Sequence, residues 1–152
     1  MDKPVIQAKQ MATYPENVMQ VLQANGISCS CDKSKRLVYV LYEGHFGEIY
    51  SIYCEGNRGS IDNFTLYPFS VPDGRREEVE QCLAKINGPD SAMGFYIDTE
   101  TGCIAFYSRY RKALDAGGDA EGITSFCMET HKACLKHQIS LYVLTGGRKG
   151  KG

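Results

Sequence analysis

The side chains best suited to bind a metal ion lie near the end of the sequence. Cys127, His131 and Cys134 are four and then three residues apart, so they share one stripe of a predicted helix. Thiolate and imidazole groups are zinc ligands, and Cys82 or His137 could complete a set. The alternative is that both cysteines belong to an apolar core stripe with His131 at its margin. Structural zinc sites pair ligands on tight turns, as in C-x-x-C, and the sequence has no such pair, so we predict no metal and no cofactor.

A second pair of thiols occupies alternate positions of a predicted strand. Cys29 and Cys31 therefore share a strand face, and Lys33 and Lys35 follow them. A redox-active dithiol needs a helix N-terminus or a cation that lowers its pKa, but lysines of this kind occur in any solvated turn. Free cysteines are among the most buried residues, so we favour packing. The seven cysteines are an odd number, and the N-terminus has no apolar export signal, so we expect reduced thiols in a cytoplasmic protein.

The sequence offers no combination of side chains that is typical of an enzyme. Asp98 and Glu100 could form a carboxylate pair, but they stand in a predicted hairpin turn, where Asp is common because it bonds to the backbone. The Gly-rich stretch 56–59 joins two strands, whereas a phosphate-binding loop requires a strand-to-helix junction. No nucleophile elbow, metalloprotease helix or dinucleotide fingerprint is present. We therefore predict a protein that is not an enzyme.

Tyrosine is the residue type that points to binding. The chain has ten Tyr, six Phe and no Trp. Tyrosine on the sheet face that does not form the core provides a rigid amphipathic binding surface. Strand propensity alone is the alternative explanation, because aromatic residues favour strands in general. The tyrosines that we predict to line an aromatic sheet face are Tyr39, Tyr42, Tyr50, Tyr53, Tyr107 and Tyr110.

Short runs of β-branched and aromatic residues predict the strands that carry these tyrosines. The runs at 27–31, 36–43, 46–55 and 61–67 are separated by short turn signals, which indicates an antiparallel meander of three or four strands. Both alternating sets of residues in 36–43 are apolar. We therefore expect this strand to be central and covered on both faces.

Helical patterns precede, interrupt and follow the strands. Helices are predicted at 15–25, 77–86 and about 123–144, and a hairpin at 94–98 and 103–110. The sequence thus predicts an α+β fold with an antiparallel sheet, in the order helix, three or four strands, helix, two-strand hairpin, helix. The helices should cover part of the sheet.

Length and composition fit one domain without a membrane span. The 152 residues are 43% hydrophobic and 23% charged, and no apolar run approaches the ~20 residues of a spanning helix. We expect a loose N-terminal arm at 1–14, one domain at 15–144 and a disordered basic tail at 145–152. Without the tail's three cations, 14 cations face 18 anions, a net charge of -4. An acidic body argues against a nucleic-acid partner.

The order of several short motifs resembles the YbjN family of bacterial proteins. The family has a "VP…R…E" helix, an "N…G-F" junction and an acidic turn with Gly before the next strand. The matching segments are Phe69–Pro72, Arg75–Val79, Ile86-Asn87, Gly94–Asp98 and Gly102–Phe106. The resemblance covers about residues 15–144, and the signal lies in the order of the motifs. The number of cysteines and the basic tail depart from the family's pattern.

The resemblance implies a fold like that of the type III secretion chaperones. Those proteins are small, acidic and often dimeric, and they bind extended segments of partner proteins. The YbjN family is labelled as a sensory transduction regulator, a label that brings no catalytic residues. We therefore predict a cytoplasmic protein-binding or chaperone-like module that binds a protein partner through an aromatic sheet face or a strand edge, with homodimerisation as a further expectation. The alternative is a metal- or small-molecule-responsive regulator that uses Cys127, His131 and Cys134.

Overall fold

A computed structural model of the chain describes residues 13–88, 93–111 and 120–147. The predicted N-terminal arm up to residue 12 and the tail from residue 148 lie outside the described residues. The strands are β1 (Ser30–Asp32), β2 (Leu37–Gly44), β3 (Gly47–Glu55), β4 (Ile61–Ser70), β5 (Met93–Ile97) and β6 (Cys103–Tyr110). The helices are α2 (Glu16–Ala24), α3 (Arg76–Asn87), α4 (Ala120–Lys136) and α5 (Gln138–Leu144), and a 3-10 turn, η1 (Asn57–Gly59), joins β3 to β4.

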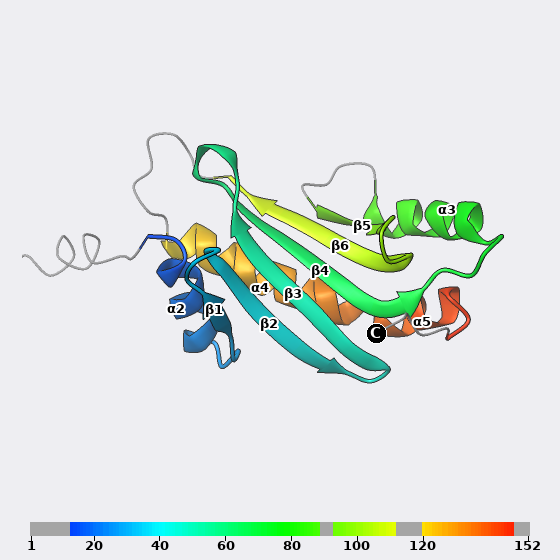
Figure 1. Cartoon of the computed structure of the whole chain (residues 1–152), viewed down its shortest axis with the longest axis horizontal. Helices are drawn as coiled ribbons and strands as arrows, with labels where there is room; N and C mark the ends of the chain where they lie inside the picture. Colours follow the sequence, from blue (N-terminus) through cyan, green and yellow to red (C-terminus); the bar gives the residue numbers. More distant parts are fainter. Residues whose placement is uncertain (1–12, 89–92, 112–119, 148–152) are drawn as a thin grey trace, which may run out of the picture.

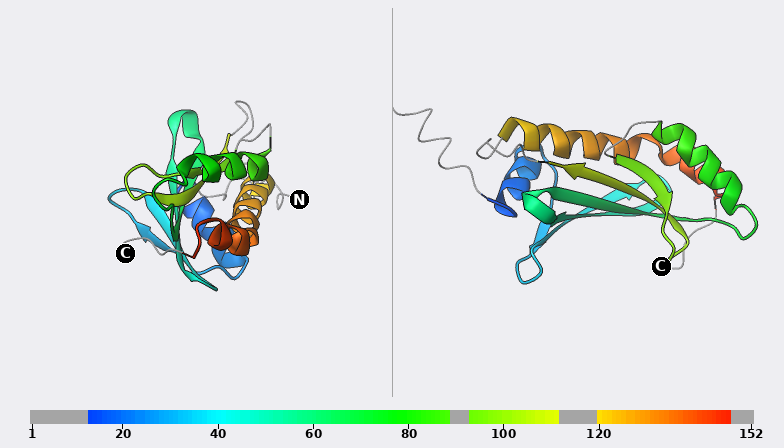
Figure 2. Two further views of the ribbon diagram at one scale, coloured as in Figure 1. Left: turned by 90° about the vertical axis from the view of Figure 1, so that its right-hand side faces the viewer. Right: turned by 90° about the horizontal axis from the view of Figure 1, so that it is seen from above.

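Within these residues the six strands form one antiparallel sheet in the order β1-β2-β3-β4-β6-β5. The four α-helices all lie on one side of this sheet, so the described residues form two layers and no described helix covers the other face (Figures 1 and 2). The predicted mixture of helices with an antiparallel sheet is confirmed. No helix in the described ranges is long and apolar enough to cross a membrane.

The hydrophobic core lies between the sheet and the helices. Alternate strand residues such as Val38, Tyr53 and Phe106 point toward the helices and are fully or almost fully buried, and Leu22 of α2 and Val79 of α3 meet them from the helical side. Each side chain of this size contributes about 1.5–3 kcal/mol when it is fully buried. This alternation fixes which face of each strand is the inner face.

A band of polar side chains crosses the middle of the inner face. Asn63 donates from Nδ2 to Ser51 Oγ at 2.7 Å, and Thr65 Oγ1 donates to Asn63 Oδ1 at 2.7 Å. Ser108 and Thr130 of α4 share a hydroxyl hydrogen bond at 2.9 Å. Because these groups are buried but bonded to one another, they avoid the cost of unpaired polar atoms. They are also small, so the middle of α4 can lie close to the sheet.

The described ends of the chain are held by specific contacts. Tyr14, inside the predicted loose arm, is buried, and its hydroxyl group donates to the carbonyl oxygen of Arg36 at 2.6 Å and lies 2.9 Å from that of Tyr53. The predicted last helix is divided at His137 into α4 and α5. The division turns α5 toward the β2–β3 turn, where the ring of Tyr142 stacks on Phe46 with centroids 3.9 Å apart.

Candidate functional site

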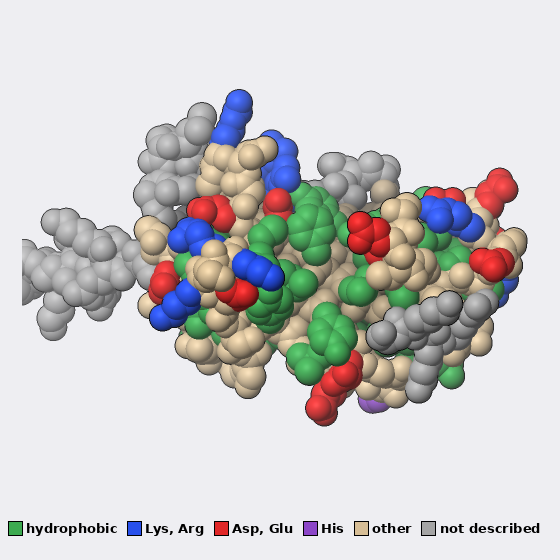
Figure 3. Space-filling view, in the orientation of Figure 1, with side chains coloured by type: hydrophobic (Ala, Val, Ile, Leu, Met, Phe, Trp, Pro, Cys, Tyr) green, Lys and Arg blue, Asp and Glu red, His purple; other side chains and the backbone are tan. Residues whose placement is uncertain are grey.

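The sheet face that the helices leave open carries large exposed apolar side chains. Strand pairing places Leu41 opposite Tyr50 and Ile52 opposite Phe64, so the side chains of β2, β3 and β4 form continuous rows. Figure 3 shows hydrophobic side chains gathered across this open face. The large hydrophobic side chains most exposed on it are Leu41 at 48%, Tyr50 at 51%, Phe64 at 41% and Tyr96 at 39%. We call this surface the open face.

The six tyrosines named from the sequence divide between the two faces of the sheet. Tyr39, Tyr50 and Tyr107 alternate with buried neighbours and lie on the open face. The other three, Tyr42, Tyr53 and Tyr110, belong to the inner face. Three further open-face residues, Leu41, Phe64 and Tyr96, are not among the residues predicted to bind a partner. These residues can be assigned to the open face only when the face of each strand that packs on the helices is known.

Contacts with α4 account for the inward position of two of these tyrosines. Tyr42 is buried, and its hydroxyl group forms a hydrogen bond of 3.0 Å with Nδ1 of His131. The ring of Tyr110 packs on that of Phe126, with centroids 5.8 Å apart. Tyr53 is fully buried in the core. These side chains pack in the sheet–helix interface, where Tyr42 and Tyr53 are buried and Tyr110 is partly buried.

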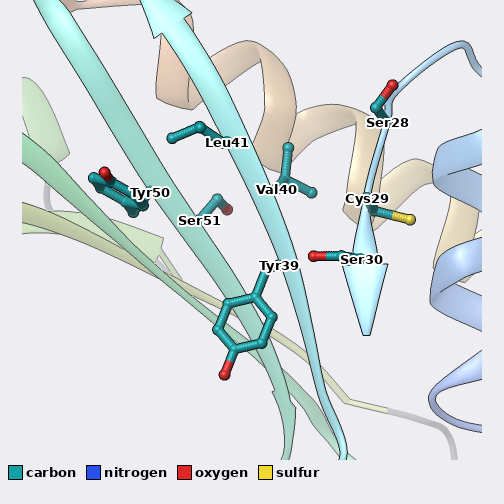
Figure 4. A pocket seen from close by; sticks show the side chains of 8 residues that line it. All are labelled: Ser28, Cys29, Ser30, Tyr39, Val40, Leu41, Tyr50 and Ser51. Carbon is teal, nitrogen blue, oxygen red and sulfur yellow. The ribbon is translucent and has the colours of Figure 1, made fainter. Parts of the chain in front are cut away.

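A cavity of about 440 Å³ lies beside β2 at Ser30, where β1 begins. The pairing of these strands covers only three residues of β1, and it begins with Ser30 opposite Tyr39. The preceding residues, Ser28 and Cys29, diverge from β2, which leaves a gap beside Val40 (Figure 4). The full lining is Ser28, Cys29, Ser30, Tyr39, Val40, Leu41, Tyr50 and Ser51. The cavity therefore joins the open face to the exposed edge of β2.

The two ends of the open face differ in their charges. At one end Asp62 is neutralised by Arg109, whose Nε and Nη2 lie 2.7 Å and 3.2 Å from its carboxylate oxygens. At the other end two exposed carboxylates, Glu43 and Glu48, stand directly opposite each other on β2 and β3. The hydroxyl group of Tyr50 donates to Glu48 Oε1 at 3.1 Å, and this bond raises the pKa of Tyr50. Among the described residues no ion pair neutralises these two carboxylates, which border the cavity end of the open face.

The opposite edge of the sheet is covered by a side chain. Asn87, the last residue of α3, donates from Nδ2 to the carbonyl oxygen of Phe95 at 2.8 Å, and its Oδ1 accepts from the Phe95 N–H at 2.6 Å. One amide thereby pairs both backbone groups of a residue on the edge strand β5. Gly94 leaves room for it, because a Cβ atom there would meet Asn87 Cγ at 3.1 Å.

The cysteine–histidine stripe of α4 faces the core. Cys127 and Cys134 are fully buried, and burial is the main cause that raises the pKa of each thiol to about 12. The Sγ atom of Cys134 forms a 3.2 Å hydrogen bond with Thr65. Burial also lowers the pKa of His131. In the ranges that the structure describes, no group of three or more His, Cys, Asp or Glu side chains could hold a metal ion.

The remaining candidates have structural surroundings. Cys29 is half-buried beside α2, and burial is the main cause that raises the pKa of its thiol, the opposite of what an activated thiol requires. Asp98 Oδ2 accepts hydrogen bonds from the N–H and the hydroxyl group of Thr101, at 3.0 Å and 2.7 Å. It closes the β5–β6 turn, and Glu100 beside it is exposed. Cys29 and Asp98 thus have the surroundings of a packing residue and a turn residue.

Comparison of the sequence with known proteins gives no role for the open face or the cavity. No family model matches the sequence, and a search of curated proteins gave no match. The resemblance to the YbjN family therefore stays a prediction. The open face, the cavity at its border and the charges around them are the features that bear on function.

Proposed function

We propose that this protein is a non-enzymatic, cytoplasmic protein-binding module that holds a partner on the open face of its sheet. The observation that carries the proposal is the exposure of Leu41, Tyr50 and Phe64 on neighbouring strands. An antiparallel sheet with one solvated face normally has polar side chains on that face. Contiguous apolar side chains on an exposed surface mark interaction sites in soluble proteins.

The open face is stiff, and its four long strands alone provide more than half the area of a standard protein interface. Four strands at about 4.8 Å spacing and eight residues at about 3.3 Å rise cover roughly 500 Å², before the edge strands are added. Standard interfaces take about 800 Å² from each partner. Aromatic side chains such as Tyr50 and Phe64, held on paired strands, lose little conformational entropy on binding and can act as anchors.

The order of the helices and strands supports a chaperone-like or regulatory role. A helix, four strands, a helix, a hairpin and C-terminal helices follow one another along the chain. This is the arrangement implied by the resemblance to the YbjN family and to the type III secretion chaperones. We therefore include a chaperone-like or regulatory role within that family in the proposal. Asn87 and Gly94, which support one another, belong to the "N…G-F" junction that carries the resemblance.

A comparison of surface variants tests the proposal. The double variant Tyr50→Ser with Phe64→Ser should lose a protein partner that the unchanged chain retains on an affinity column loaded with lysate of the native host. The matched control is Ile139→Ser with Val143→Ser on α5, which removes side chains that are 65% and 67% exposed on the helical side of the molecule. Equal recovery of the same partner by both double variants would exclude the open face as the binding surface. Thermal denaturation should show that both variants fold.

A further inference from the structure

The two edges of the sheet differ in how their backbone groups are covered. Sheet edges present unpaired N–H and C=O groups that can pair with another chain. On β5 the side chain of Asn87 pairs both groups of Phe95, and α3 lies beside the strand. On the other side β1 pairs with β2 only as far as Tyr39. Within the described chain, no strand lies against residues 40–44 on the side away from β3.

The register of the β2–β3 hairpin shows which backbone groups face this gap. Gly44 pairs with Gly47 across a two-residue turn, so the pairs that exchange hydrogen bonds with β3 include Gly44, Tyr42 and Val40. The intervening residues, Leu41 and Glu43, direct their N–H and C=O groups away from β3. These groups border the gap that β1 leaves open. Five residues of β2 extend about 16 Å, enough for a peptide of about the same length.

The walls of the gap fit an extended peptide with alternating apolar side chains. In Figure 4 the chain before β1 leans away from β2, and Leu41 and Tyr50 stand on the adjoining open face. A strand added to β2 would place every second side chain on this face, beside Leu41 and Glu43. The cavity of about 440 Å³ between the strands leaves room for the added backbone.

The charges at the end of the gap indicate a cation on the incoming peptide. Glu43 and Glu48 are directly opposite each other, and like charges in that position are destabilising. The ion pairs of the described residues join Arg36 to Glu55, Arg75 to Glu78, Arg76 to Glu80 and Arg109 to Asp62. None of them neutralises Glu43 or Glu48. A lysine or arginine brought in by a partner would do so.

We propose that the free edge of β2 accepts an extended segment of a partner protein as an added strand, with an apolar side chain beside Leu41 and Tyr50 and a lysine or arginine against Glu43 and Glu48. The inference rests on the proposed function and deepens it, because it states the conformation and the chemistry of the bound segment. Main-chain hydrogen bonds to Leu41 and Glu43 would supply affinity, and the side-chain positions would supply specificity.

A displayed library of random decapeptides, selected on the full chain, tests this proposal. Enriched peptides should alternate apolar and polar residues and carry a cation at one end. In fluorescence polarisation, Leu41→Pro should weaken binding of an enriched peptide about tenfold or more, because proline removes an N–H that faces the gap, whereas Leu41→Ala should have a smaller effect. N-methylation of the bound peptide at every second amide should weaken binding when the methylated amides are those that face β2, and not when they are the alternate set. This test uses the unchanged protein, so it does not depend on the folding of a variant.

Charge variants test the second half of the proposal. Glu43→Lys with Glu48→Lys should weaken the same peptide about tenfold and remove most of its salt dependence, whereas Glu100→Lys on the opposite edge should leave binding unchanged. Peptides enriched without a cation, or a library that yields no binder to the folded chain, would overturn the proposal. So would equal binding to Leu41→Pro and Leu41→Ala.

Two other occupants would also overturn it. If the chain binds no peptide until residues 1–12 or 148–152 are deleted, the edge belongs to the protein's own terminus. If light scattering shows a dimer that Leu41→Pro dissociates, the occupant is a second copy. The two proposals can fail separately. If Leu41→Pro still captures the partner protein but the double variant Tyr50→Ser with Phe64→Ser does not, the inference about the edge is wrong and the proposed function stands.

Discussion

In the central strands the face covered by helices carries several polar side chains, whereas the exposed face carries large apolar ones. Ser51, Asn63 and Thr65 lie on the covered face, where they bond to one another, whereas Tyr50 and Phe64, their neighbours along the chain, are exposed. Hydrophobicity alone therefore does not determine which face becomes the core. The position of α4 does, because small bonded polar groups let the helix approach closely while the large apolar groups remain outside for a partner.

The largest expected difference between the faces concerns aromatic side chains. Phe106→Ala on the covered face should lower the free energy of unfolding by about 3–5 kcal/mol, because it leaves a cavity in the core. Phe64→Ala on the open face should cost less than about 1 kcal/mol. Urea denaturation measures both values. Similar costs for the two variants would mean that the open face is buried in solution.

The polar band of the covered face should also contribute to stability. Asn63→Ala should lower the free energy of unfolding by about 1–3 kcal/mol, because it leaves Ser51 and Thr65 without a shared partner in a buried site. Asn57→Ala in the exposed turn η1 is the matched control and should have almost no effect. If Asn63→Ala proves as mild as the control in urea denaturation, the buried network does not stabilise the fold.

The covered side also protects one edge of the sheet. Asn87→Ala should cost about 1–2 kcal/mol in urea denaturation, since it unpairs both backbone groups of Phe95. Hydrogen exchange should become faster at the Phe95 amide and stay unchanged at β3. Gln81→Ala on the exposed side of the same helix controls for helix propensity. Unchanged exchange at Phe95 would contradict the edge-protecting role of the Asn87 amide.

The smallest expected effect is a pH dependence on the open face. The Tyr50 hydroxyl group donates to Glu48, and this bond raises the pKa of Tyr50 above its ordinary value of about 10. The bond's contribution to stability is therefore present below that ordinary pKa and is lost as the pH rises through the raised one. Glu48→Gln should lower the pKa of Tyr50 in a phenolate absorbance titration, with Tyr50→Phe as the assignment control. An unchanged titration would show that the bond does not form in solution.

The sequence predicts the fold class but not the faces of the sheet. Turn signals and alternating apolar runs indicate an α+β protein with an antiparallel sheet, and that much is confirmed. Because both alternating sets of β2 and β3 contain tyrosine, the pattern cannot separate Tyr42 and Tyr53 from Tyr39 and Tyr50. Only contacts with α4 distinguish them, and those contacts join residues far apart in the chain.

The site depends even more on such long-range contacts. The gap beside β2 exists because β1 begins at Ser30, three residues later than the predicted start at residue 27. The last helix is divided just before Gln138, and the side chain of Gln138 bonds to a distant turn, because its Oε1 accepts the His45 N–H at 3.2 Å. Neither feature has a local sequence signal. The pairing of Asn87 with Phe95, by contrast, falls within a short motif that sequence reasoning noticed without knowing its role.

The stacking of Tyr142 on Phe46 determines what a fluorophore or a purification handle at the C-terminal end of the chain would lie beside. Gly147 lies so close to the ring of Tyr142 that a Cβ atom there would meet its Cζ at 2.9 Å. The described chain thus ends beside the tip of the β2–β3 hairpin. A fluorophore linked after residue 147 would report on ligands that arrive at the hairpin, whereas a bulky purification handle in the same place would obstruct them.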